Sequence, residues 1–148
     1  MNAACLALIV LLLTQSATSL AGPPPPRECV LNVHATGFRN EKGQADAAVF
    51  RSPEGWPEGK SQFVDDASPI RGGESTISFH IPPGRYSVVV LHDENSNHKM
   101  DRDILGVPKE GFGFSNNPHV FLKAPPFQQA NFTVGCPVTN ITVRIIYK

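Results

Sequence analysis

The chain lacks an excess of charge of either sign: 13 Lys and Arg residues balance 13 Asp and Glu residues over 148 positions. Without a basic surplus, it has no electrostatic footprint for nucleic acid or for an anionic membrane. It also lacks C-x-x-C, H-E-x-x-H and G-x-S-x-G motifs. No known motif therefore indicates a thiol redox protein, a zinc protease or a serine hydrolase. What remains, 41% hydrophobic and 18% charged residues, is typical of one folded domain.

Charged side chains are also missing from the amino-terminal segment, where the first one is Arg27. Residues 3–13 form an apolar run of 11 residues, shorter than the ~20 needed to cross a bilayer. A polar stretch at 14–16 and a small-x-small site ending at Ala21 follow. This pattern predicts a secretory signal peptide over residues 1–21, with an uncleaved anchor as the alternative. The mature protein is then secreted, extracellular or periplasmic, and does not span a membrane.

Few cysteines are present, and two of the three lie in the predicted mature chain. Residues 22–28 contain four consecutive prolines and predict an extended leader before a domain at 29–148. Cys29 opens the first strand-like run and Cys136 precedes the last. In an oxidising compartment, a remaining even pair so far apart predicts a structural disulfide. Closing a loop of roughly 100 residues stabilises the folded state by up to about 4.7 kcal/mol.

Helical periodicity is nearly absent after the signal segment, and its best candidate is a turn or two at residues 61–66. Alternation of apolar and polar residues dominates instead, in six runs: 29–35, 45–49, 77–81, 86–91, 130–134 and 141–147. Glycine and proline separate these runs, and 86–91 is apolar on both faces, as in a central strand. The pattern predicts an all-β fold, a single antiparallel β-sandwich of about seven strands.

Two N-x-[ST] sequons lie in the last strand-like runs, at Asn131 and Asn140. In both runs the Asn and the Thr fall on the polar side of the alternation. They are therefore expected to face solvent, and glycosylation is physically possible if the source is eukaryotic.

The segment after the central strand carries the clearest candidate site. Its side chains at loop positions 1, 3, 5 and 9 are Asp93, Asn95, Asn97 and Asp101, a spacing typical of calcium loops. His98 stands where such loops prefer glycine, and position 12 is not Glu, so Asp103 or Glu110 would have to supply the last ligand. Few carboxylates contribute, which favours an affinity of ~10⁻⁴–10⁻³ M for calcium. The alternative is a hairpin closed by Asx turns without metal.

A long segment at 105–118 follows, with alternating Gly and Phe and then two Asn residues. Long ordered loops in small domains are often functional. One interpretation is a binding loop formed by Phe112, Phe114, Asn116 and Asn117. The other is a loop folded over the end of the sandwich, with both rings filling the core.

Three blocks carry a resemblance to a known family: PPGRY at 82–86, HDEN at 92–95 and GVPKEGFGFSNN at 106–117. They resemble an uncharacterised, mainly bacterial family known by a domain-of-unknown-function number, 2141. The resemblance covers most of the mature chain and implies a small secreted or periplasmic β-sandwich, similar to transthyretin-like and carboxypeptidase-regulatory-like domains. It implies no established activity. A looser likeness is to calcium-binding B-type repeats of bacterial surface adhesins. The chain departs from the family in His98, the cysteine pair and the sequons.

Three functional hypotheses follow. The first is a secreted, non-enzymatic β-sandwich with a structural calcium site at Asp93, Asn95, Asn97, Asp101 and Asp103. The second is a module that binds an extracellular protein or glycan through the Phe-rich loop, with help from Trp56. The third is a small metal-dependent hydrolase. Solvent exposure of the two Phe rings distinguishes the second from the first.

Overall fold

The computed structural model describes residues 27–121 and 123–148. The predicted signal peptide and the prolines of the predicted leader lie outside the described residues. The elements are eight strands and one short helix: β1 (Cys29–Thr36), β2 (Gln44–Phe50), β3 (Val64–Ser68), β4 (Glu74–Ile81), β5 (Gly84–Asp93), β6 (Gly111–Phe114), α1 (Phe127–Ala130), β7 (Phe132–Val134) and β8 (Val138–Arg144). No helix of the described residues is long and apolar enough to cross a membrane.

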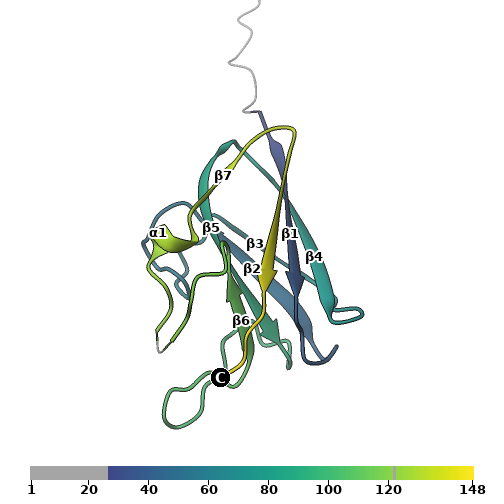
Figure 1. The fold of residues 1–148 in the computed structure, drawn as a ribbon, viewed down its shortest axis with the longest axis vertical. Coiled ribbons are helices and arrows are strands. Elements are labelled where there is room, and N and C mark those ends of the chain that lie inside the picture. The colour runs from purple at the N-terminus through teal and green to yellow at the C-terminus, as the bar shows by residue number, and fades with distance from the viewer. Residues whose placement is uncertain (1–26, 122) are drawn as a thin grey trace, which may run out of the picture.

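The strands form two sheets that pack face to face, as the sequence predicts for a β-sandwich (Figure 1). The smaller sheet has the order β4-β1-β8, and the larger sheet has the order β3-β2-β5-β6, with β7 paired to the first part of β5. β5 therefore has neighbours on both sides, which confirms the prediction of a central strand. One ladder is not antiparallel: β8 runs parallel to β1, and the long connection that a parallel pair requires is supplied by the chain from β2 to β7.

The core lies between the sheets and follows the predicted alternation. Leu31 and Val33 of β1 are fully buried, as are Val88 and Val90 of β5. The residues between them, Asn32 and Val89, are only partly buried. The last core strand, β8, contributes Val143. Alternate side chains of a strand face opposite sides of a sheet, so the apolar set of each strand meets that of the opposite sheet.

A disulfide joins Cys29 to Cys136, as the sequence predicts, with Cα atoms 4.7 Å apart and the two residues 107 positions apart in the sequence. It ties the start of β1 to the segment just before β8. Beside it, the backbone N–H of Val30 donates to the carbonyl of Pro137. The bond therefore closes nearly the whole domain into one covalent loop.

A second apolar cluster covers the outer face of the larger sheet. Phe112, Phe114 and Ala130 are its buried members, and Trp56 packs against them. The Trp56 ring lies 5.5 Å from the Phe114 ring, and its Nε1 donates to the carbonyl of Pro125 at 2.9 Å. Through Trp56, Val120 and the carbonyl of Pro125, this cluster holds two loops onto the outer face of the sheet.

Candidate binding groove and the Asp/Asn-rich loop

The loop after β5 is organised by the carboxylate of Asp93, which is fully buried. Its Oδ1 accepts a hydrogen bond from the backbone N–H of Asn97 at 3.0 Å, and its Oδ2 accepts one from the N–H of His98 at 2.7 Å. Ser96 and His98 both have positive φ, 57° and 58°. His98 thus occupies a left-handed position that favours glycine, in agreement with the departure noted from the sequence.

Three further side chains of the predicted calcium set contact one another inside the loop. The Asp101 carboxylate accepts hydrogen bonds from the amides of Asn95, at 2.6 Å, and Asn97, at 3.2 Å. The amide oxygens of Asn95 and Asn97 accept backbone N–H groups of the loop, those of Asn97 and Lys99. The side chains at loop positions 1, 3, 5 and 9 therefore form one polar network.

Glu110, which follows the loop in the sequence, binds the backbone at both ends of it. The side chain is buried, and its Oε1 accepts the N–H of Glu94 while Oε2 accepts the N–H of Asp101, both at 3.0 Å. One carboxylate thus holds both ends of the loop. Glu110 is one of the two residues predicted from the sequence to replace the missing ligand at position 12.

The other substitute, Asp103, belongs to a separate turn. Its Oδ1 accepts the N–H groups of Leu105 and Val107 at 2.8 and 2.9 Å. The structure therefore groups Asp93, Asn95, Asn97 and Asp101 with Glu110, and it places Asp103 in the neighbouring turn.

Asp46, on β2, lies beside the loop and is a neighbour that sequence reasoning missed. Among the described residues, ligand atoms of Asp46, Asp93 and His98 lie within 4.8 Å of one another, and Nδ1 of His98 is 2.9 Å from Oδ2 of Asp46. Burial raises the pKa of the Asp46 carboxyl, the hydrogen bond to His98 opposes this shift, and the nearby charge of Asp93 adds to it. Alternation along β2 places Asp46 on the outer face, but only tertiary structure brings it to the loop.

A buried polar network fixes the base of the loop. His92 is fully buried; its Nε2 donates to the carbonyl of Lys42 at 3.0 Å, because a carbonyl only accepts. In the neutral ring, Nδ1 then accepts from the hydroxyl of Tyr147 at 2.7 Å. The Tyr147 oxygen also accepts the N–H of Arg39 at 3.0 Å, and burial raises the pKa of this phenol. Both ring nitrogens of His92 are thus engaged internally.

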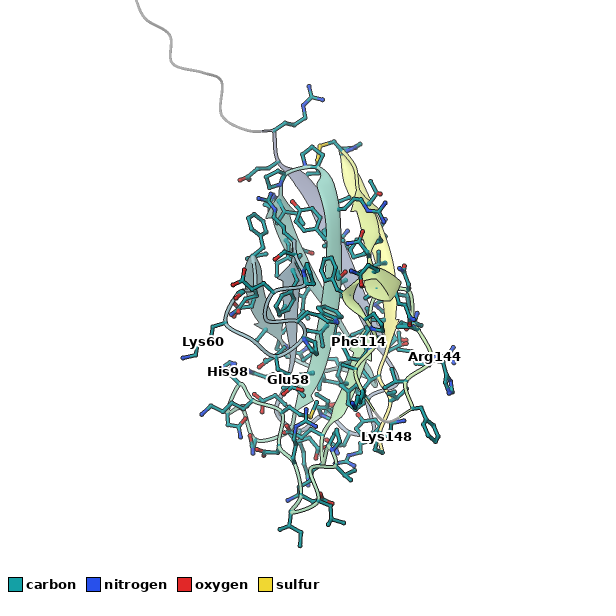
Figure 2. All side chains as sticks on the ribbon, turned by 90° about the vertical axis from the view of Figure 1, so that its left-hand side faces the viewer. Glu58, Lys60, His98, Phe114, Arg144 and Lys148 are labelled. Carbon is teal, nitrogen blue, oxygen red and sulfur yellow. A yellow bond between two sulfur atoms is a disulfide. The ribbon has the colours of Figure 1, made fainter. Side chains whose placement is uncertain are left out.

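Beside the loop, a groove of about 990 Å³ runs over the outer face of the larger sheet. Its floor is apolar and comes from β2, β5 and β6: Ala48, Val89, Leu91, Phe112 and Phe114. The segments 57–62 and 98–108 contribute to its walls, together with Val120, Phe121, Lys123 and Ala124. Figure 2 shows the side chains around this face, with His98 and Glu58 on one side of Phe114 and Lys148 on the other.

Phe112 and Phe114 do not form an exposed platform. They lie on strand β6 rather than in a loop, and they are only 7% and 4% exposed. The glycines between and before them face the other side, where a Cβ on Gly113 would overlap the backbone oxygen of Arg144. The alternation of Gly and Phe therefore reflects a close approach on one face and a small apolar cluster on the other. The rings are buried, as the second interpretation of the sequence expects, but they lie on a strand and in a cluster separate from the core between the sheets.

Asn116 and Asn117, the other two predicted binding-loop residues, are exposed but are used within the fold. Both have positive φ, 64° and 47°. The Asn116 amide donates to the carbonyls of Gln129 and Asn131. Asn117 donates to the carbonyl of Thr142 and accepts the N–H of Arg144. The two residues tie the end of β6 to α1 and β8.

The two sequons differ in their surroundings. Asn140 is exposed, on the outer face of the smaller sheet, and its Oδ1 accepts from the amide of Asn32. Asn131 is half-buried, and its Oδ1 accepts from Nε of Arg85 at 2.5 Å. Asn140 therefore fits the expected solvent-facing position better than Asn131.

The fold and the groove define a small β-sandwich domain with an apolar cleft on the outer face of its larger sheet. A family model described as "Uncharacterized protein conserved in bacteria (DUF2141)" matches residues 33–142. The chain belongs to this family, which confirms the resemblance seen in the three sequence blocks. No curated protein and no solved structure matches the chain.

Proposed function

We propose that the protein is a secreted, non-enzymatic β-sandwich domain that binds a ligand in the groove on its larger sheet. The groove itself carries the proposal. Its volume, about 990 Å³, lies at the upper end of the range of small-molecule sites, and it combines an apolar floor with a few polar groups at its walls. A disulfide between distant cysteines is typical of oxidising compartments, which supports secretion.

The apolar rim of the groove supports binding further. Leu105 and Phe121 line it and are 82% and 72% exposed, and Val107 beside them is 40% exposed. Large exposed apolar side chains gathered at one opening mark ligand or partner sites. We prefer binding to hydrolysis because the buried carboxylates nearby are occupied: both oxygens of Asp93 and both of Glu110 accept backbone N–H groups.

The proposal is tested with a neutral fluorescent apolar probe, Nile red, and a substitution that fills the groove. Ala48→Phe places a ring on the floor and is expected to weaken probe binding at least tenfold, as followed by fluorescence titration. Thr142→Phe is the matched control, because it adds the same ring at an exposed position on the smaller sheet. Absence of saturable binding, or equal affinity in both variants, would overturn the proposal.

We further propose that the Asp/Asn-rich loop, one wall of the groove, holds a structural calcium ion. The support is the network formed by Asp93, Asn95, Asn97 and Asp101. Carboxylate and amide oxygens at this sequence spacing are typical calcium ligands. An ion there would offset repulsion between the carboxylates and order the wall. Binding to the folded state alone would then add stability by linkage.

Calcium is expected to raise the melting temperature of the mature, oxidised protein relative to chelator. With a dissociation constant of ~10⁻³ M, 10 mM calcium adds about 1.4 kcal/mol, or roughly 3–6 °C for a domain of this size. Asp101→Asn, which removes one charge of the network, is expected to abolish the shift, whereas Asp103→Asn in the neighbouring turn should keep it. A melting temperature that calcium does not change would contradict the calcium site and indicate a hairpin closed by its own Asx turns.

A further inference from the structure

The charge of the side chains that line the groove changes across the sheet, from β3 to β6. On one side, the carboxylates of Asp65 and Asp66 on β3 and of Asp46 on β2 line it. The apolar floor on β2, β5 and β6 follows, and beyond β6 come two lysines, Lys123 and Lys148. Strands in a sheet are about 4.8 Å apart, so β6 lies roughly 10 Å from β2, which carries Asp46, and roughly 14 Å from β3, which carries Asp65. Figure 2 shows this order, with His98 on one side of Phe114 and Lys148 on the other.

The carboxylates on the acidic side have partners within the protein. Asp46 is bonded to His98 and to the amide of Gln44, and Asp65 accepts from the amide of Gln62. Glu58, on the wall next to them, forms an ion pair with Arg102. These negative charges are thus partly satisfied before any ligand arrives.

The lysines are different. Among the described residues, no carboxylate lies within 4.0 Å of the ammonium groups of Lys123 or Lys148. Lys99 also lines the groove, but it follows His98 on the acidic side. Nζ of Lys148 donates to the carbonyl of Val120 at 2.7 Å, which uses one of its three donors. The positive side of the groove therefore retains both charge and hydrogen-bond donors for a ligand.

From this arrangement we propose that the groove takes an amphiphile with an apolar body and one anionic head group, such as a medium-chain or long-chain carboxylate. The apolar body lies on the floor formed by Val89, Leu91 and Phe112, and the rim residues Leu105 and Phe121 cover it. The head group lies at Lys123 and Lys148, where it meets unpaired ammonium groups next to apolar surface. The inference rests on the proposed function of the groove as a binding site.

The experiment compares three ten-carbon amphiphiles below their micelle concentrations: decanoate, decanol and decyltrimethylammonium, each by displacement of Nile red. We expect decanoate to bind at least tenfold more tightly than the cation, and high salt to reduce this difference. Lys123→Gln combined with Lys148→Gln should remove the preference for decanoate over the cation, with each affinity compared with that variant's own affinity for Nile red. Lys60→Gln is the control, since Lys60 is exposed and does not line the groove.

The outcomes separate the two proposals. If decanoate, decanol and the cation bind equally well, or if the lysine variant keeps the preference, the anionic head group is wrong and the groove remains a binding site. A preference for the cation would assign the head group to the Asp46 and Asp65 side instead and would equally overturn the inference. If neither Nile red nor any amphiphile binds, the proposed function fails as well.

Discussion

Replacing both disulfide cysteines, Cys29→Ala with Cys136→Ala, is expected to lower the free energy of unfolding by about 2–5 kcal/mol. The reason is the position of the bond, which links residues 107 positions apart and closes nearly the whole domain. Without it, the unfolded chain regains the entropy of a long open loop. β8, which pairs in parallel with β1, also loses its covalent tether to that strand.

Chemical denaturation and thermal melting of the two proteins measure the effect, and a fall of roughly 8–20 °C in melting temperature is expected. Reduction of the wild-type protein serves as the control, because it should reproduce the variant without any change of sequence. A double variant that melts within about 3 °C of the oxidised wild type would show that the sheets hold the two chain ends together without the bond.

Substitution of Glu110 is expected to produce the second large effect. The carboxylate is buried and accepts the backbone N–H groups of Glu94 and Asp101. Glu110→Ala leaves both donors without a partner, and a buried unsatisfied donor costs about 1–3 kcal/mol. We therefore expect a loss of about 2–4 kcal/mol in the free energy of unfolding, with faster hydrogen exchange in the loop.

The isosteric variant Glu110→Gln refines this test, because its amide oxygen still accepts one of the two N–H groups. Its stability should lie between those of the wild type and Glu110→Ala. Glu41→Gln is the matched control: Glu41 also accepts a backbone N–H, that of Gly72, but at an exposed site. A change below about 0.5 kcal/mol is typical of such surface positions. Equal losses in Glu110→Gln and Glu41→Gln would contradict the role of Glu110 as a buried clamp.

Local periodicity was sufficient to predict much of the fold. The alternation in β1, β2 and β4 predicted which residues face the core, because a strand's pattern depends only on its own sequence. The disulfide followed from the count of cysteines and their compartment. The segment 61–66, by contrast, contributes to an edge strand, β3, rather than to a helical turn. Its acidic residues are polar in either conformation, and pairing with β2 decides the outcome.

The parallel ladder and the groove could not be predicted from the sequence, for physical reasons. The pairing of β1 with β8 joins segments that are not connected by a turn, so no local sequence pattern predicts it. The groove is built from strands and from three loops far apart in the sequence, and none of them has a motif of its own. Phe112 and Phe114 looked like loop residues because the glycines beside them, which permit close packing against the segment around Arg144, are also typical of irregular chain.

Within the candidate site, spacing predicted the loop and its four clustered side chains, Asp93, Asn95, Asn97 and Asp101. Spacing did not show that Glu110, rather than Asp103, closes the loop, because that depends on how the chain folds back after the next turn. Asp46 was missed for the same reason: it belongs to β2 and meets His98 only through the pairing of β2 with β5.

The most direct test of the groove as a binding site is an amide-resolved NMR titration of the labelled mature domain with decanoate. We predict that shift changes concentrate at the floor and rim, at Ala48, Val89, Leu91, Leu105 and Phe121, and saturate together. Amides on the outer face of the smaller sheet, such as those of Ser78 and Thr142, should not move. Changes confined to that opposite face, or no saturable change at any amide, would contradict the account.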